Sequence, residues 1–204
     1  MLPAERIPNR PAPALQSFSR NDTIRPNRNA PLPGFPVREK KANHMSMNTV
    51  PERLAALRAA MAANGVAVYL IPVGDPHASE YLPCHYTSLT WFSGFHGENS
   101  NFVVTRTESA LWADGRYFVQ AEKEIAGTEI KLQRMGEPGV PTVEEYCANA
   151  LNEGEALGLC GLTANTALVN DLKKALEKKG ASIKTLNLED ELWTEGRPAL
   201  PDTP

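Results

Sequence analysis

Residues 91–120 decide the fold, and they read W-F-S-G-F-H-G-E-N-S-N-F-V-V-T-R-T-E-S-A-L-W-A-D-G-R-Y-F-V-Q. Two short apolar runs lie inside this stretch, Phe-Val-Val at residues 102–104 and Ala-Leu-Trp at 110–112. β-Branched and aromatic residues in runs of this length are typical of buried strands. The polar residues 105–109 between them are typical of a turn. The stretch therefore predicts two adjacent buried strands, preceded by a glycine-rich turn.

A helix is expected to follow the second strand. Asp114 can cap its amino end, because a carboxylate accepts hydrogen bonds from free N–H groups and matches the positive end of the helix dipole. One face of this helix is predicted to be apolar, at i, i+3 and i+7; its residues are Phe118, Ala121 and Ile125. Arg116 then lies in the first helical turn, at a strand-to-helix junction. Such an arginine is a plausible binding group.

The glycines and aromatic residues of the stretch have simpler expected roles. Gly94 and Gly97 are expected to occupy turns that need a positive φ. Trp112 and Phe118, which flank Arg116, are predicted to be core side chains rather than a binding platform.

The rest of the chain alternates between helical and strand patterns. Pro51 suits a first helical turn and Asn64-Gly65 a helix end, while Thr142 and Glu145 have the spacing of a capping box. Helices are expected at 51–63, 142–151, 169–179 and 188–193, and strands at 66–71, 128–132, 157–162 and 182–186. Residues 75–81 are expected to form a loop or a short helix. This alternation predicts an α/β fold, a single three-layer-like domain with a mixed β-sheet flanked by helices.

Composition divides the chain into three parts. Residues 1–50 hold eight of the 17 prolines and eight Lys and Arg against three acidic residues. Such a segment buries too little apolar surface to fold, so residues 1–46 are predicted to be a disordered leader or tail. The alternatives are an organelle-targeting sequence and a polybasic arm, although the prolines disfavour the amphipathic helix that a targeting sequence needs. Residues 47–197 are the predicted domain, and residues 198–204 a proline-rich linker to a further domain.

Charge and cysteine content narrow the function classes. Residues 51–204 carry 13 Lys and Arg against 21 Asp and Glu, which argues against nucleic acid as a partner. No apolar run approaches the ~18–20 residues that span a bilayer. Three cysteines at long spacings, Cys84, Cys147 and Cys160, are expected to be free thiols in a reducing compartment. The chain is therefore predicted to be cytoplasmic, with no membrane partner.

Catalytic motifs are absent from the sequence: there is no H-E-x-x-H, G-x-S-x-G, P-loop or G-x-G-x-x-G. The best constellation lies at 75–80. If this segment is helical, His77 and Glu80 share a face and could hold a metal with Asp75. The favoured alternative is a capped loop, in which Asp75 and Ser79 bind backbone N–H groups and His77 lies at the surface. No catalytic residue and no metal ligand is assigned.

Arg116 has two interpretations. Its guanidinium can bind a carboxylate or a peptide carbonyl in a fixed fork. Alternatively, it forms an ion pair with Asp114 or Glu122, or is exposed to solvent, which on the residues alone is the favoured interpretation.

Four segments resemble one family. D-P-H-A-S-E-Y (75–81), W-F-S-G-F (91–95), L-W-A-D-G-R-Y-F-V-Q-A (111–121) and E-L-W-T-E-G-R-P-A-L-P (191–201) are similar to the N-terminal, creatinase-type domain of Xaa-Pro aminopeptidases (aminopeptidase P), in its longer, three-domain cytosolic-type members. The resemblance spans about residues 51–201. It implies that catalysis resides in a C-terminal pita-bread domain, where two Asp, one His and two Glu hold two divalent metals, usually manganese. That domain cleaves the bond between an N-terminal residue and a following proline.

For this chain, the resemblance implies a non-catalytic substrate-binding and assembly domain. Its partners would be a proline-containing peptide, the pita-bread domain and a second copy in a homodimer. Arg116 matches the arginine of the family's D-G-R-Y motif, which contacts the substrate, and His77 and Glu80 are secondary substrate-binding candidates. The chain departs from the family in two places. Residues 98–101 replace a turn of small residues, and residues 87–90 replace the arginines that usually precede the aromatic residue before S-G-F. The alternative is a stand-alone α/β module that binds peptides or other proteins without peptidase activity. A small hydrolase is set aside, because no nucleophile–base arrangement is visible.

Overall fold

The structure is a computed structural model that describes residue 47 and residues 49–200. The expected leader at 1–46 and most of the expected linker at 198–204 lie outside the described residues. A six-stranded sheet forms the centre of the described part, in the order β4-β3-β2-β1-β5-β6. Its strands are β1 (Val68–Pro72), β2 (Asn101–Thr105), β3 (Ser109–Ala113), β4 (Ile130–Arg134), β5 (Ala156–Leu159) and β6 (Ser182–Thr185).

The sheet is mixed, because one strand runs against the other five. β2 pairs antiparallel with both β1 and β3, in the registers Tyr69↔Val104 and Phe102↔Leu111. The remaining pairs, β1 with β5, β5 with β6 and β3 with β4, are all parallel. The carboxyl ends of β1, β3, β4, β5 and β6 therefore meet at the same edge of the sheet.

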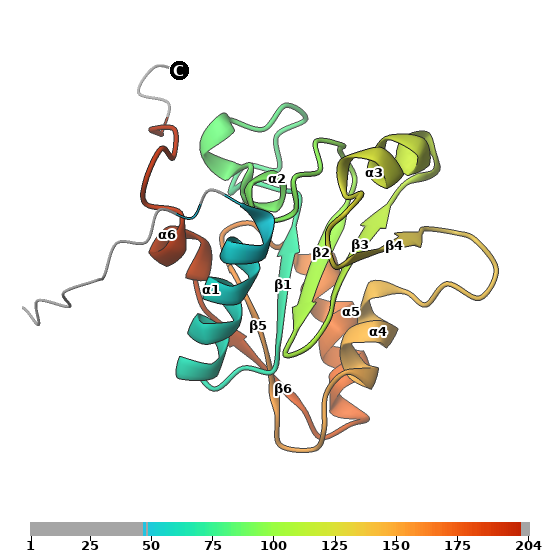
Figure 1. Cartoon of the computed structure of the whole chain (residues 1–204). Coiled ribbons are helices and arrows are strands. Elements are labelled where there is room, and N and C mark those ends of the chain that lie inside the picture. Colours follow the sequence, from blue (N-terminus) through green and yellow to red (C-terminus); the bar gives the residue numbers. More distant parts are fainter. Residues whose placement is uncertain (1–46, 48, 201–204) are drawn as a thin grey trace, which may run out of the picture. The chain divides into compact units, whose positions relative to one another are not determined.

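Helices cover both faces of the sheet, which gives three layers (Figure 1). On one face lie α1 (Val50–Ala63), α2 (Ser88–Ser93), α3 (Phe118–Glu124) and α6 (Leu188–Leu192). On the other lie α4 (Val143–Asn149) and α5 (Thr166–Glu177). The predicted α/β domain with a mixed sheet flanked by helices is confirmed.

The side-chain alternation of the strands explains why both faces need cover. In β1, Tyr69 and Ile71 enter the core under α1, whereas Val68 and Leu70 enter the core under α4 and α5. Successive side chains of a strand point to opposite faces, so an uninterrupted apolar strand must be buried on both sides. Trp112 is buried, as expected, in the core under α4 and α5. Its indole Nε1–H donates to the carbonyl of Pro141 at 2.9 Å.

Several local expectations need correction. Arg116 does not lie in the first turn of a long helix: Gly115–Tyr117 forms a 3₁₀ turn, η2, before α3 begins at Phe118. The expected strand at 157–162 ends at Leu159, because residues 160–164 fold back into a turn in which the Ala164 N–H donates to the Cys160 carbonyl at 3.2 Å. The helix α2 replaces much of the expected glycine-rich turn, and it ends at Gly94, which has the positive φ predicted for it (78°).

Gly97 serves a different purpose from the one predicted. It is not among the residues with positive φ. A Cβ at this position would lie 2.2 Å from Cζ of the buried Phe95 ring. Glycine is therefore required at position 97 because the backbone passes directly over an aromatic ring.

Candidate functional site

A large cavity lies at the carboxyl edge of the sheet. Its volume is about 610 Å³, which is within the range of small-molecule and peptide sites. Four chain segments line it: the loops that follow β1, β3 and β5, and the loop that leads into β2. In open α/β sheets, ligands bind outside the carboxyl ends of the strands, next to the point where the strand order reverses. β1 is such a point, since β2 lies on one side of it and β5 on the other.

Arg116 lies at the mouth of this cavity, on the loop that follows β3. Its side chain is 66% exposed. Nε donates to Oδ1 of Asp114 at 2.9 Å and Nη2 donates to Oδ2 at 3.3 Å. The expected ion pair with Asp114 is therefore present, whereas Glu122 pairs with Arg134 instead. Nη1 makes no hydrogen bond to any residue that the structure describes, so the exposed end of the guanidinium retains donors for a ligand.

Asp114 orients Arg116 through backbone and side chain together. Its Oδ1 also accepts a hydrogen bond from the Arg116 backbone N–H at 2.9 Å, and its Oδ2 accepts one from Nδ2 of Asn99 at 3.0 Å. The hydrogen bonds from Arg116, followed by the one from Asn99, hold the pKa of Asp114 well below its usual range. The same pairing raises the pKa of Arg116. The fork is thus held in one direction by two neighbouring loops.

The loop that follows β1 is capped by Asp75, as the favoured alternative expected, whereas Ser79 takes part as a backbone donor rather than as a second cap. Asp75, with only 5% of its surface exposed, accepts hydrogen bonds at Oδ1 from the backbone N–H groups of His77 (2.9 Å) and Ser79 (3.0 Å). The bonds from Ser79 and then His77 lower the pKa of Asp75, although burial opposes them. Because this segment is a loop, His77 and Glu80 do not share a helical face. Glu80 lines the cavity and His77 does not.

The same loop geometry brings no set of metal ligands together. Nowhere between residues 49 and 200 do three or more His, Cys, Asp or Glu side chains gather in a way that could hold a metal ion. Oδ2 of Asp75 is buried without a hydrogen-bond partner among the described residues. One buried carboxylate oxygen is not a metal site.

Asn99 is the residue at this site that sequence reasoning missed. It has a positive φ of 47°, and so has Ala78 (52°), another residue of the cavity wall. Left-handed backbone at residues other than glycine costs free energy and is found most often at functional sites. Asparagine tolerates this conformation better than most residues, which was the available signal in the sequence. Large apolar side chains, Tyr81 and Leu162, are also exposed near this edge.

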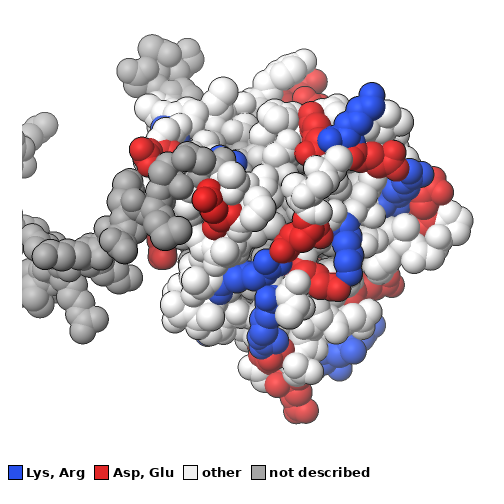
Figure 2. Space-filling model, viewed as in Figure 1, with Lys and Arg blue, Asp and Glu red and all other residues white. Residues whose placement is uncertain are grey.

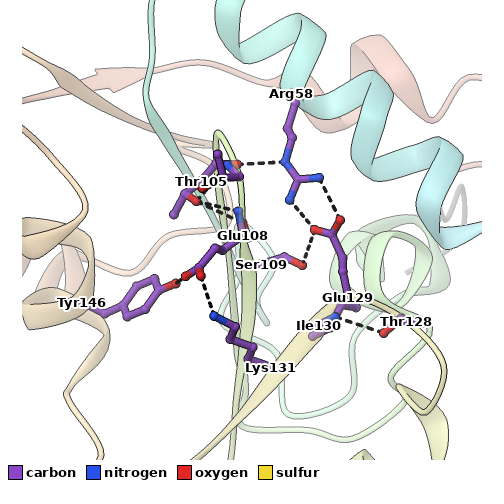
Figure 3. A network of polar contacts seen from close by, with 10 residues as sticks. Arg58, Thr105, Glu108, Ser109, Thr128, Glu129, Ile130, Lys131 and Tyr146 are labelled. Carbon is purple, nitrogen blue, oxygen red and sulfur yellow. Dashed lines mark hydrogen bonds and ion pairs between the residues drawn. The ribbon is translucent and has the colours of Figure 1, made fainter.

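The opposite, amino-terminal edge of the sheet carries a closed polar network (Figure 3). Arg58 of α1 donates through Nε to the Thr105 carbonyl at 3.0 Å and through both Nη atoms to the carboxylate of Glu129. Glu129 also accepts from the Ser109 hydroxyl at 3.0 Å. A second group follows beside it, in which Glu108 accepts from Lys131 at 2.5 Å and from the Tyr146 hydroxyl at 3.4 Å.

Acidic and basic side chains alternate on the face of the molecule shown in Figure 2. This mixture fits the many ion pairs of the described chain, such as Arg106 with Glu155 and Arg197 with Asp190. None of the helices between residues 49 and 200 has the length and apolar character needed to cross a membrane.

Comparison with known proteins gives a family and a set of relatives. Residues 53–192 match the model of the creatinase/prolidase N-terminal domain. Aminopeptidase P2 of Arabidopsis thaliana is 38% identical over 157 residues, which are 74% of this chain and 22% of that protein. A probable Xaa-Pro aminopeptidase P of Sordaria macrospora is 37% identical over 163 residues, which are 78% of this chain and 26% of that protein. The chain thus spans about a quarter of the length of these curated relatives.

Two solved structures extend the comparison. An X-prolyl aminopeptidase from Caenorhabditis elegans, described as a cytosolic enzyme with a di-nuclear active site, superposes with a TM-score of 0.68 at 34% identity. The match covers 78% of this chain and 27% of that one. The N-terminal domain of the cytoplasmic peptidase PepQ from Mycobacterium tuberculosis superposes with a TM-score of 0.51 at 25% identity, and 97% of that chain is covered.

Proposed function

This chain belongs to the creatinase/prolidase N-terminal domain family and corresponds to the N-terminal domain of an aminopeptidase P; from this premise, we propose that it is the substrate-binding and assembly domain of a metallopeptidase. The proposed reaction is removal of the N-terminal residue that precedes proline. The proposed location is the cytoplasm, as for the relatives described as cytosolic or cytoplasmic.

The observation that carries the proposal is the oriented guanidinium of Arg116. It lines the cavity at the carboxyl edge of the sheet, with Asp114 bound to one edge of the fork and Nη1 left without a partner in the described chain. A peptide carbonyl or a terminal carboxylate would accept hydrogen bonds from this free edge. Asp114 and Asn99 would act as positioning residues, because they fix the direction of the fork without reaching the peptide themselves.

The metal chemistry of such an enzyme would have to come from outside residues 49–200, since no ligand set is present there. Two divalent ions, usually manganese, are what the family resemblance implies for the catalytic domain. We therefore expect the isolated chain to release no N-terminal residue from X-Pro peptides, with or without added manganese. Manganese-stimulated release by the purified chain, in a preparation free of host peptidase, would contradict this division of roles.

The test of the binding role uses a full-length enzyme that contains this domain. Loss of one charge-assisted hydrogen bond costs about 1.5–3 kcal/mol, so Arg116→Ala should lower kcat/KM on X-Pro peptides by roughly 10- to 150-fold. Arg116→Lys should restore only part of this activity, because an ammonium group cannot reproduce the fork. Thermal stability and metal content should remain those of the parent enzyme.

Arg106→Ala is the matched control. Arg106 is also an exposed arginine in an ion pair, with Glu155, but it lies at the opposite edge of the sheet. Its replacement should leave kcat/KM unchanged. Equal effects of the two substitutions, or full activity in a well-folded Arg116→Ala enzyme, would remove Arg116 from the substrate site and leave this domain as a scaffold.

A second candidate function is a peptide-binding module that works without a catalytic domain. It is favoured by one observation: loops of this domain that follow three strands and precede a fourth converge on one cavity of about 610 Å³ that includes Arg116. The distinguishing measurement is binding of a proline-containing peptide to the isolated chain by isothermal titration calorimetry. Binding that disappears in Arg116→Ala would support the module. Absence of binding would favour the assembly role, in which this surface and the homodimer expected from the resemblance act only within the longer protein.

A further inference from the structure

A buried carboxyl group lies away from the candidate site, on α6. Glu189 is 3% exposed, and its Oε2 accepts a hydrogen bond from the hydroxyl of Tyr69 on the central strand β1. That hydroxyl also lies 3.0 Å from the Leu186 carbonyl and accepts from the Leu188 backbone N–H at 3.1 Å. One tyrosine thus joins the sheet to the beginning of α6.

The surroundings of Glu189 contain no cation that hydrogen-bonds to it among the described residues. A small cavity of about 130 Å³ adjoins it. The titratable and charged groups that face this region are Tyr69 of β1, Cys160 after β5, His85 of the 3₁₀ turn η1 (Cys84–Tyr86), Asp190 of α6 and Arg197. Arg197 is engaged elsewhere, since it pairs with Asp190 and donates from Nε to the His85 carbonyl at 3.1 Å. The α1 side chains in the core shared with Leu188 are apolar: Leu54, Leu57 and Met61.

These surroundings favour the neutral form of the carboxyl group. Burial raises the pKa of Glu189 to about 7, although the hydrogen bond from Tyr69 and the charge of Arg197 oppose this. Burial likewise raises the pKa of the Tyr69 hydroxyl, so this group remains a donor across the neutral range. Glu189 therefore changes its charge between pH 6 and pH 8 while it is buried.

The segment that includes Glu189 is the last helix of the described chain, and it packs on α1 and α2. Leu188 is buried in the core, and Trp193 stacks on Trp91 with ring centroids 5.5 Å apart. Beyond Trp193, Arg197 donates to the His85 carbonyl, and Nδ1 of His85 lies 2.8 Å from the Pro198 carbonyl. The last described strand, β6, ends at Thr185, so α6 and the residues up to 198 can open as one local unit without breaking a strand pair.

We infer that residues 188–198 form a pH-dependent latch, which stays on the sheet while Glu189 is protonated and opens more readily once Glu189 has lost its proton. The closed latch buries the carboxyl group, and the open latch returns it to water. The ionised form is therefore disfavoured only in the closed state.

The direction of the effect follows from linkage. The closed state has the higher affinity for the proton, so its stabilisation is complete below the ordinary pKa of a glutamic acid and is lost as pH rises toward about 7. With this shift, the equilibrium constant for opening should increase by roughly 50- to 100-fold between pH 5 and pH 8. The protonated latch is the tighter one.

Hydrogen exchange of the whole chain, followed by NMR from pH 5 to pH 8 and corrected for intrinsic exchange rates, tests the inference. The amides of α6 should have lower protection factors than those of β2, and these factors should fall by roughly the amount given above. In Glu189→Gln, which keeps the shape and an acceptor for Tyr69, protection in α6 should not change with pH. Glu191→Gln, an exposed glutamate on the same helix, should behave like the parent chain.

Two results would overturn the inference. One is protection in α6 that is independent of pH in the parent chain or falls equally in Glu189→Gln. The other is equal protection in α6 and β2, because the segment would then open only with the whole domain. If Glu189→Gln does not fold, Tyr69→Phe replaces it. Loss of the donor raises the pKa of Glu189 further, so the fall in protection should extend to higher pH, and an unchanged profile would count against the latch.

Discussion

The two ends of the central sheet satisfy their polar groups in different ways. At the amino-terminal end, Arg58, Glu129 and Ser109 form a closed set of hydrogen bonds, and Glu108 has two donors of its own (Figure 3). At the carboxyl end, Oδ2 of Asp75 is buried without a partner in the described chain, and the guanidinium of Arg116 has a free edge.

This difference separates stability from recognition within one small domain. At the amino-terminal end the charged side chains pair with one another, so the main contribution of this network is to hold the strands together. Unsatisfied polar groups and left-handed backbone at Ala78 and Asn99 cost stability and are retained where a partner can use them. We therefore expect removal of a polar side chain at the amino end to change mainly folding, and removal of one at the exposed carboxyl edge to change mainly binding.

The largest effect should come from breaking the carboxyl end itself. A Cβ at Gly74 would lie 2.5 Å from the backbone oxygen of Thr163, so Gly74→Ala must push apart the two loops that wall the cavity. Overpacking of this kind costs about 1–3 kcal/mol, which should lower Tm by roughly 3–10 °C. Gly115→Ala is the control: it lies in the loop that carries Arg116, and its nearest neighbours are 3.9 Å away. Melting temperatures are measured by calorimetry. Equal values for the two variants would show that the two loops can move apart without loss of stability.

Arg58→Ala should have the next largest effect on stability. It removes two donors from Glu129 and one from the Thr105 carbonyl, in a network that is only partly exposed. We expect a loss of about 1–2 kcal/mol in the free energy of unfolding, measured by urea denaturation. Arg106→Ala, which removes a single exposed ion pair, should change this free energy by less than about 0.5 kcal/mol. If the two losses were the same, the network would be no stronger than an ordinary surface pair.

The acid limb of the stability curve should sharpen the comparison. The hydrogen bonds from Arg58, followed by that from Ser109, lower the pKa of Glu129. A carboxyl group whose pKa is lowered by folding stabilises the folded state fully above its ordinary pKa, and this contribution is lost as pH falls from there through the lower pKa of the folded state. Glu129→Gln should therefore flatten the dependence of Tm on pH between about 5 and 3. The effect should be modest because Glu129 is 42% exposed, and an unchanged slope would exclude Glu129 as its source.

The smallest change in stability is expected for Arg116→Ala in this chain. Its pair with Asp114 is exposed, and surface ion pairs contribute little. Tm should remain within about 1 °C of the parent value, in contrast to Arg58→Ala. A drop as large as that of Arg58→Ala would mean that Arg116 supports the fold, and it would weaken the division between the two ends.

Much of the fold could be predicted from the sequence because its central strands β1, β2 and β3 contain uninterrupted apolar runs. Burial on both faces of the sheet is required for two apolar runs, Phe102-Val103-Val104 and Ala110-Leu111-Trp112. The expected capping box also forms, between Thr142 and Glu145. The helix α2 was missed because its six residues are too few to establish a helical period. Gly97 was misjudged because a close approach to an aromatic ring leaves no local signature.

Less of the candidate site could be predicted, for a physical reason. The sequence identifies Arg116 as a group worth attention and Asp114 as its neighbour. It does not encode that Gly74 meets Thr163, or that Asn99 reaches Asp114, because these contacts depend on how the loops of four strands converge. The hydrogen bond between Tyr69 and Glu189 could not be predicted from local sequence patterns either, because the two residues are 120 positions apart.

The stacked pair of Trp91 and Trp193 has an optical consequence. The rings lie 5.5 Å apart with planes inclined by 17°, and they connect α2 with the end of α6. Two indoles so close share their electronic excitation, so their transitions split into a pair of circular-dichroism bands of opposite sign. Trp112, on the other side of the sheet, stands apart from this pair. The chain therefore carries its own chromophore pair, whose couplet reports whether the carboxyl-terminal segment is seated, without any added label.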